Sequence, residues 1–486
     1  MEVNNLEPQD LWQNFVQLNA VPRASKKEEQ VIAFMLGFGQ KLGLETIKDS
    51  IGNVVIKKAA TPGMEDRKTV ILQSHLDMVH QKNSDIDFNF DEQGIAMFVD
   101  GDWVKAQGTT LGADNGIGVA TIMAVLASET IEHPALEAMF TIDEETGMTG
   151  AKQLDPANFS GSILLNLDTE EDDELTIGCA GGIDTNTRYH YRQEPADAQG
   201  TAFQLKIKGL LGGHSGMDIH KGRANANKLM NRLFYTLSQT VNIQLHSVDG
   251  GSLRNAIPRE SAAVIVVPYG QKELFVLLLK QFREVLADEY HTAEPALQIT
   301  LEETALPSRV MTFVDFKKIV NAIYAVPNGV FRMSPDIKDL VEASTNLARV
   351  IIKDGEFITQ SLQRSSVEST KADVSNAVSA AFENMGCDVQ QGGDYPGWKP
   401  DPDSAILRLM TGLYQQAFGK SPRVEACHAG LECGILGAHL PGTDMISFGP
   451  TIRGAHSPDE RVQISSVKKF WSYLLAVLKE IPKEDK

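Results

Sequence analysis

The sequence predicts an α/β protein in two parts: a discontinuous domain with a mainly parallel sheet, and an α+β domain inserted into it. Helix and strand patterns alternate towards both ends of the chain, whereas the middle has strands of period-two alternation between helices. At 486 residues, the chain is too long for one hydrophobic core. We therefore expect residues 1–187 and 396–486 to form the discontinuous domain and residues 188–395 to form the inserted one.

In the discontinuous domain, residues 68–79 (KTVILQSHLDMV) form an almost continuous apolar run. Such a run is typical of a strand that is covered on both faces of an α/β sheet. The other expected elements alternate around it, as a parallel sheet with crossover helices requires. The expected helices are 28–44, 115–129, 404–419 and 465–482, and the expected strands are 53–58, 135–147, 161–171 and 444–451.

The inserted region contains two successive sets of strands and helices, which predicts two similar halves with helices on one face. A stretch rich in glycine and proline, residues 390–404, is expected to be the linker back to the first domain. The expected helices are 225–239, 272–290, 315–325 and 371–385, and the expected strands are 201–210, 242–251, 260–269, 345–352 and 356–364.

Composition excludes several classes of partner. The formal net charge of −19 argues against nucleic acid and anionic membranes, and no apolar run is long enough to span a bilayer. The four cysteines form no C-x-x-C pair and no disulfide framework. Because the first residues lack the pattern of a signal peptide, we expect a cytoplasmic protein.

His75 and Asp77 lie two residues apart at the end of the apolar run, so they share one face of the strand. Alone, this pair fits a surface ion pair, a satisfied core histidine or a metal ligand beside a carboxylate. Four other segments also place metal-competent groups where a strand ends or a helix begins. Together the five segments supply His75, Asp77, Asp114, Glu144, Glu145, Asp168 and His456.

Ligands of open α/β sheets bind outside the carboxyl ends of the strands. Two imidazoles and five carboxylates gathered there would be costly to bury without cations. Because one carboxylate can bridge two ions, five side chains are enough to hold two metals, with zinc favoured and manganese or cobalt as substitutes. Asp77 could then orient the ring of His75, and Glu144 could act as general base, although a Glu-Glu pair at a strand end is also common in solvated loops.

Several motifs, in order along the chain, make it resemble the M20 family of di-zinc metallopeptidases: HLDMV, GTTLGADNGIG, DEETGMTGA, NLDTEE, GGHSG, LRNAIPRE, HAGLECG and GPTIRGAHSPDE. The resemblance covers essentially the whole chain and is closest to the family's bacterial dipeptidases. It implies a di-zinc peptidase domain with an inserted lid domain, a homodimer, and hydrolysis of small dipeptides with broad specificity. It also implies a preference for Xaa-His substrates, including β-alanyl-histidine.

The resemblance assigns roles to the site residues. Two Zn²⁺ per subunit would be held by His75 and Asp168 on one side and by His456 and Glu145 on the other, with Asp114 bridging. Asp77 and Glu144 would be catalytic. In the lid, His214 would stabilise the oxyanion, and Asn255 and Arg364 would hold the substrate. In the HAGLECG motif, outside the lid, Gly430 would make a backbone contact near the substrate and Glu432 would support the site.

Two other functions stay open from the sequence. Related folds remove acyl groups from N-acyl amino acids or trim C-terminal residues as carboxypeptidases. An inactive binding protein could use the same metals as a structural staple, but it would have no need of Asp77 and Glu144.

Overall fold

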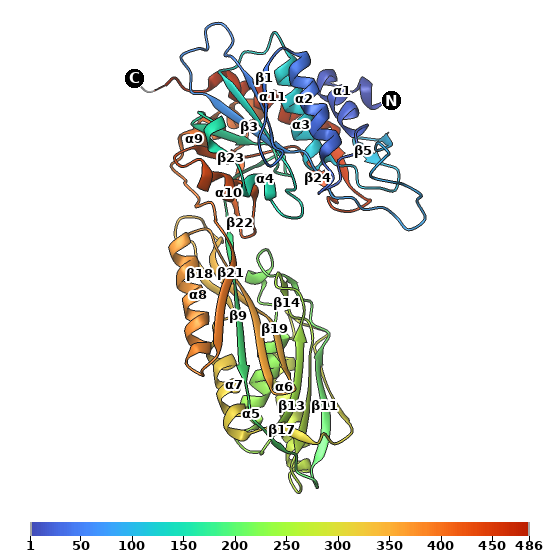
Figure 1. Ribbon diagram of the computed structural model, residues 1–486, viewed down its shortest axis with the longest axis vertical. Helices are drawn as coiled ribbons and strands as arrows, with labels where there is room; N and C mark the ends of the chain where they lie inside the picture. Colours follow the sequence, from blue (N-terminus) through green and yellow to red (C-terminus); the bar gives the residue numbers. More distant parts are fainter. Residues whose placement is uncertain (1, 485–486) are drawn as a thin grey trace. The chain divides into compact units, whose positions relative to one another are not determined.

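The computed structural model describes residues 2–484, and the chain divides into two compact units (Figure 1). Unit 1 contains the chain up to Gly178, Pro400–Ala426 and the chain from Leu431. Unit 2 contains Cys179–Lys399 together with Cys427–Gly430. The chain thus leaves unit 1 after Gly178, builds most of unit 2, returns at Pro400, and later adds the short segment Cys427–Gly430 to unit 2.

Unit 1 is built on an eight-stranded sheet whose centre is parallel. β3 (Val70–His75) pairs in parallel with β6 (Leu136–Thr141) and β7 (Ile163–Asn166), and β7 pairs in parallel with β23 (Asp444–Ser447). Every residue of β3, β6 and β7 is buried, as expected for strands covered on both faces. The mainly parallel sheet that the apolar run at 68–79 predicted is therefore confirmed.

The flanking strands of this sheet are β1 (Glu45–Lys48), β2 (Val54–Lys58), β8 (Glu174–Cys179) and β22 (Arg423–Cys427). A separate four-stranded sheet contains β4 (Met97–Asp100), β5 (Trp103–Ala106), β24 (Ile452–Arg453) and β25 (Arg461–Gln463). The helices of unit 1 are η1 (Val3–Asn5), α1 (Gln9–Asn19), α2 (Glu29–Lys41), α3 (Ala113–Ala127), α4 (Thr149–Lys152), η2 (Pro156–Asn158), α9 (Ala405–Phe418), α10 (Glu432–His439) and α11 (Ile464–Glu480).

Unit 2 consists of two halves with the same topology, each in the order strand, helix, strand, strand, helix, strand. One half contains β11 (Thr201–Lys208), α5 (Ala226–Leu237), β13 (Gln244–Gly251), β15 (Ser261–Val267), α6 (Lys272–Glu289) and β16 (Gln298–Glu303). The other contains β9 (Gly181–His190), α7 (Phe313–Ala325), β19 (Val341–Lys353), β20 (Glu356–Ser365), α8 (Glu368–Glu383) and β21 (Asp388–Tyr395).

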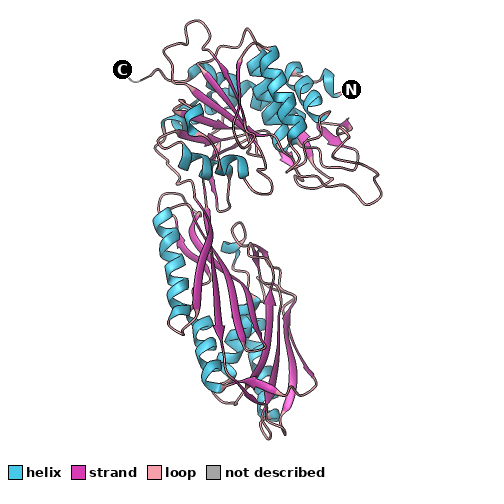
Figure 2. Ribbon diagram, viewed as in Figure 1, coloured by secondary structure: helices cyan, strands magenta, loops and turns pink. Residues whose placement is uncertain are grey.

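Within each half the spatial strand order is fourth, first, third, second, and the halves join where β13 pairs with β19. Figure 2 shows the helices of unit 2 gathered on one face of this sheet. Side chains from the helices and strands of both halves form one continuous hydrophobic core. Short elements complete unit 2: β10 (Gln193–Pro195), β12 (Gly213–His214), η3 (Ile219–Lys221), β14 (Ala256–Ile257), β17 (Arg309–Met311) and β18 (Gly329–Met333).

The halves are nested rather than successive, which differs from the sequence-based expectation. β9 precedes the first half in the chain but pairs with β20 and β21 of the second. The expected boundary after residue 187 therefore falls inside a strand. The stretch 390–404, expected to be a linker, begins with the end of β21. The sequence did not predict this edge strand because it is rich in glycine and exposed polar residues, whereas strand prediction depends on a buried apolar face.

None of the helices in residues 2–484 combines the length and apolar character needed to cross a membrane.

Asp315 is a buried carboxylate that connects α7 to the end of β9 and to the segment that follows it. It accepts hydrogen bonds from the Tyr189 hydroxyl at 3.0 Å, from the Arg192 backbone N–H at 2.9 Å and from the Thr312 hydroxyl at 3.0 Å. Burial opposes its charge, but these hydrogen bonds prevail and lower the pKa of Asp315 below the usual value. The charged form of Asp315 thus stabilises the half of unit 2 that contains β9 and α7.

We expect Asp315→Asn to destabilise unit 2 at neutral pH by about 2 kcal/mol, since hydrogen bonds to a charged group are lost. Because the folded-state pKa is lowered, the advantage of the unchanged protein is complete above an ordinary aspartate pKa of about 4 and fades as pH falls through the lowered value. Urea unfolding of both proteins across this pH range measures the difference. The exposed Asp288→Asn of α6 is the control, and an equal effect of the two changes would contradict the prediction.

Candidate metal centre

The predicted strand-end residues of unit 1 lie at one edge of its sheet. β6, β3 and β7 are adjacent and parallel, so their carboxyl ends meet there. His75 is the last residue of β3, Glu144 and Glu145 lie in the turn after β6, and Asp168 follows β7. This arrangement brings together residues that are far apart in the chain.

Asp114 enters this edge from the first turn of α3, and His456 enters from the loop between β24 and β25. The backbone is not helical at Asp114 (φ −81°, ψ 108°), so the regular helix begins after it. His456 has a left-handed backbone with φ 64°. Both side chains thus come from irregular backbone. The periodicity of helices and strands therefore cannot predict the direction in which they point.

The carboxylate of Asp114 lies between the two imidazoles. Its Oδ1 is 3.2 Å from His75 Nε2, which is also 3.5 Å from Asp168 Oδ1. Its Oδ2 is 3.2 Å from His456 Nε2, which is also 3.0 Å from Glu145 Oε2. Each oxygen of Asp114 therefore shares a set with one histidine and one other carboxylate.

These two sets fit divalent metal ions. The ligand atoms of His75, Asp114 and Asp168 all lie within 4.8 Å of one another, and so do those of Asp114, Glu145 and His456. Within residues 2–484, the buried oxygens Glu145 Oε1 and Asp168 Oδ1 have no hydrogen-bond partner. Imidazole nitrogen with carboxylate oxygen is a donor set that suits zinc and similar ions. The residues present could hold divalent metal ions.

The electrostatics also favour cations at this edge. Burial raises the pKa of Glu145 and of Asp168, and the neighbouring carboxylate of Asp114 adds to both effects. Hydrogen bonds to Asp114 and Glu145 raise the pKa of His456 to about 11. Carboxylates that crowd together out of water require compensating positive charge.

Asp77 contacts both the turn that carries the two glutamates and the ring of His75. Its Oδ1 accepts the backbone N–H of Glu144 at 3.0 Å, and its Oδ2 accepts that of Glu145 at 3.2 Å. Its Oδ2 also accepts the hydroxyl of Ser25 at 2.7 Å, a contact that the sequence did not suggest. His75 Nδ1 lies 3.1 Å from the backbone oxygen of Asp77 and 3.4 Å from Oδ1.

Glu144 lies beside these ligands. One ligand atom each of His75, Glu144 and Glu145 lies within 4.8 Å of the others. Burial raises the pKa of Glu144 well above its usual value, although the charge of His75 opposes the shift. The backbone leaves the strand geometry at Thr141 and is left-handed at Asp143 (φ 53°), which allows adjacent glutamates to face one region.

Glu432, the first residue of α10, is buried behind this edge. Its Oε2 accepts hydrogen bonds from Gln73 Nε2 at 2.7 Å and from the Thr141 hydroxyl at 2.9 Å. Burial raises its pKa to about 8. A single glutamine in an apolar strand gives no sequence signal for a contact with a residue so far along the chain.

The predicted lid residues belong to unit 2, where His214 has a defined tautomer. His214 Nδ1 accepts the backbone N–H groups of Gly216 and Met217, each at 3.1 Å. Nε2 must therefore carry the proton of the neutral ring. Burial and the charge of Arg364 lower the pKa of His214, which keeps the ring neutral. Such a ring presents one N–H donor.

Arg364, in β20, is a buried guanidinium that donates to the Tyr395 hydroxyl at 2.8 Å. Its Nε has no hydrogen-bond partner in the part of the chain that the structure describes. Gly430 packs on the same tyrosine ring, since a Cβ there would lie 3.1 Å from Tyr395 Cε2. Asn255 is exposed, and its backbone oxygen accepts the N–H of Ser215 beside His214.

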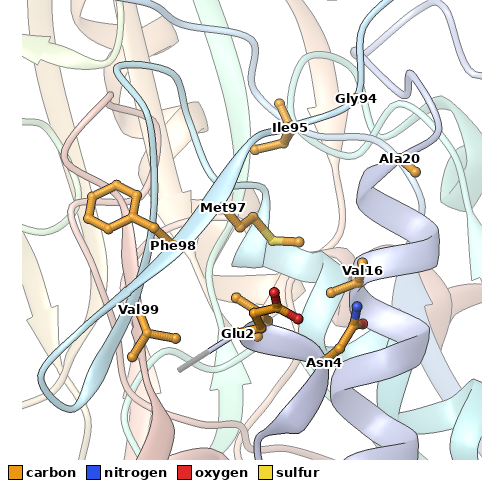
Figure 3. A pocket seen from close by; sticks show the side chains of 10 residues that line it. Glu2, Asn4, Val16, Ala20, Gly94, Ile95, Met97, Phe98 and Val99 are labelled. Carbon is orange, nitrogen blue, oxygen red and sulfur yellow. The ribbon is translucent and has the colours of Figure 1, made fainter.

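A separate hollow of about 670 Å³ in unit 1 lies between η1, α1 and β4 (Figure 3). Its lining is mostly apolar, including Val16, Met97 and Phe98, and Glu2 is its one acidic residue. It shares no residue with the two metal-competent sets and has no donor set for a metal.

Comparison with known proteins identifies the family. The chain is 41% identical over 481 residues, 99% of each chain, to the cytosol non-specific dipeptidase of Escherichia coli strain K12. It matches the crystal structure of aminoacylhistidine dipeptidase from Vibrio alginolyticus with a TM-score of 0.96 and 42% identity, over 100% of this chain and 99% of that one. Aminopeptidase PepT from Bacillus cereus shares the fold, with a TM-score of 0.57 and 15% identity over 98% of this chain and 99% of that one. The family model for peptidase family M20/M25/M40 matches residues 71–480, and the chain belongs to this family.

Proposed function

We propose that this protein is a zinc-dependent dipeptidase of broad specificity that prefers Xaa-His substrates, including β-alanyl-histidine. The observation that carries the proposal is the placement of Asp114 between two histidine–carboxylate sets, with Glu144 beside them. The substrate class is supported by the names of the two relatives above, a non-specific dipeptidase and an aminoacylhistidine dipeptidase.

The cofactor would be two Zn²⁺ per subunit, with Co²⁺ or Mn²⁺ as substitutes. His75 and Asp168 would bind one ion, His456 and Glu145 the other, and Asp114 would bridge them. The short distances from each Asp114 oxygen to its own histidine support this division. When bound, such ions polarise the scissile carbonyl and make a water molecule acidic.

Glu144 would act as the general base. Its carboxylate takes a proton from the attacking water and later gives that proton to the departing amine. The raised pKa of Glu144 supports this role, since a carboxyl group must hold the proton between the two steps. Asp77 would keep Glu144 aimed through the two backbone hydrogen bonds of the turn.

The residues of unit 2 would recognise the substrate. The Nε2–H of His214 is suited to donate to the carbonyl oxygen as negative charge develops there. The incompletely bonded guanidinium of Arg364 is suited to the free carboxylate of a dipeptide. Asn255 and the close-packed Gly430 would contribute the remaining contacts with the substrate.

We also propose a cytoplasmic homodimer. The cytoplasmic location rests on the cytosol relative. The dimer is supported by large apolar side chains exposed on the helices of unit 2, among them Leu277, Phe313 and Val314.

A substrate panel on the zinc-loaded protein tests the activity. We expect hydrolysis of β-alanyl-histidine and several Xaa-His dipeptides, little action on a tripeptide, and loss of activity after chelation that added Zn²⁺ restores. Activity on acetyl- or succinyl-amino acids without dipeptide hydrolysis would favour a deacylase instead. Metal binding without any hydrolysis would favour an inactive, metal-stapled protein.

Glu144→Gln should lower kcat by about 10²–10⁴-fold, because the proton transfer loses its base. Bound metal, measured by plasma mass spectrometry, should stay near two ions per chain, since the amide leaves the proposed ligands intact. The exposed Glu129→Gln of unit 1 serves as the matched control. Full activity of Glu144→Gln would remove the general-base assignment.

Arg364→Lys should raise KM for a dipeptide by about 10- to 100-fold, because the bidentate charged contact is lost. KM for the corresponding dipeptide amide, which has no carboxylate, should be high in both proteins and change little. Steady-state kinetics on the two substrates measure the difference, with the exposed Arg188→Lys as control. An equal change for acid and amide would argue against carboxylate recognition.

A further inference from the structure

We propose that two buried charged residues, Glu460 and Arg23, are positioning residues that hold the loop bearing Asp114 against the segments bearing His75 and His456. They would thereby set the affinity of the site for metal. This inference rests on the proposed function only in that it requires the five side chains to bind metal. The sequence assigned no role to either residue.

The side chain of Glu460 binds backbone N–H groups of the loop that carries Asp114. Oε2 accepts the N–H groups of Leu111 and Gly112 at 2.7 and 2.8 Å. Oε1 accepts those of Ala113 and Asp114 at 2.7 and 3.1 Å. The N–H groups of Ala113 and Asp114 begin α3, where no preceding helical turn can satisfy them, and those of Leu111 and Gly112 lie just before the helix. One carboxylate therefore fixes the whole approach to Asp114.

The same residue belongs to the segment that carries His456. The N–H of Glu460 donates to the backbone oxygen of Ser457 at 3.0 Å, which closes a turn directly after the histidine. Glu460 is only 2% exposed, so solvent does not compete for its oxygens. The positions of Asp114 and His456 are thus coupled through one side chain.

Arg23 makes the corresponding connection to the end of β3. Its guanidinium donates to the backbone oxygens of Leu76 at 3.1 Å and Asp77 at 3.2 Å, directly after His75. It also donates to the backbone oxygen of Gly112 at 2.5 Å and to Asn19 Oδ1 at 2.9 Å. At 1% exposure it is one of the largest fully buried side chains of the described structure.

The two residues meet at the peptide groups of Gly112, whose N–H binds Glu460 and whose oxygen binds Arg23. Gly112 has φ 70°, and a Cβ there would lie 2.5 Å from Arg23 Nη2. A Cβ on Gly116 would lie equally close to the same atom. Two glycines of the GADNGIG motif therefore make room for the buried guanidinium.

Stability alone is a weak reason for this arrangement. Buried charges cost desolvation energy, and apolar replacements of similar volume are often as stable or more so. Charged side chains instead give directional hydrogen bonds, because two of them fix seven backbone groups of two ligand-bearing segments. Residues that orient metal ligands typically affect metal affinity by 10- to 100-fold.

The test is to titrate Co²⁺ into the metal-free protein and to monitor binding both by calorimetry and by the visible absorption of the bound ion. We expect Glu460→Gln and Glu460→Asp each to weaken at least one of the two binding events by about 10- to 100-fold. Aspartate keeps the charge but is too short to reach all four N–H groups, so it separates positioning from charge. Arg23→Lys, which also keeps its charge, should weaken binding and alter the absorption spectrum.

The matched control is Glu137→Gln. Glu137 is a buried carboxylate of β6 that accepts the backbone N–H groups of Ser160 and Gly161, away from the ligand loops. The Glu137→Gln variant should have a lower thermal midpoint than the unchanged metal-free protein but the same affinity for Co²⁺. The positioning role is overturned if Glu460→Asp and Arg23→Lys bind Co²⁺ as the unchanged protein does, or if Glu137→Gln weakens binding equally. Failure of the unchanged protein to bind Co²⁺ would instead refute the proposed function.

Discussion

The position of the Asp114 carboxylate between two imidazoles is the constraint on which the candidate metal centre of unit 1 depends. Each of its oxygens lies 3.2 Å from a different histidine, and each histidine has a second carboxylate partner. So much acidic charge in a mostly buried place is unfavourable without cations. Parallel strands solve the problem of assembly, because adjacent carboxyl ends deliver their side chains to one edge.

Around Asp114, hydrogen bonds from buried side chains to backbone groups hold the segments that carry the site residues. Asp77 fixes the turn of Glu144 and Glu145, while Glu460 and Arg23 fix the loop before Asp114. Backbone groups are suitable anchors because they have fewer degrees of freedom than side chains. The proposed chemistry, in which Glu144 must meet a water molecule at a defined distance, depends on such rigidity.

The family and the mainly parallel sheet were predictable from the sequence, and both are confirmed. Buried strands such as β3 carry a strong apolar signal, and strand-end acids and histidines are conspicuous beside it. The nesting of unit 2 was not predictable. β9 and β21 carry many polar residues, and their pairing joins segments about two hundred residues apart. No local pattern encodes a partner at that separation.

The sequence by itself determined which chemical groups are available and in what order the strands present them. It predicted that His75, Asp114, Glu145, Asp168 and His456 belong together, since their spacing relative to strand ends is local information. Only the tertiary structure decided which oxygen faces which nitrogen and which buried charges hold the loops. The contact of Glu460 with the Asp114 N–H spans 346 residues, and that of Arg23 with Gly112 spans 89. Such contacts depend on how the chain packs in three dimensions, and neither periodicity nor composition carries a signal for them.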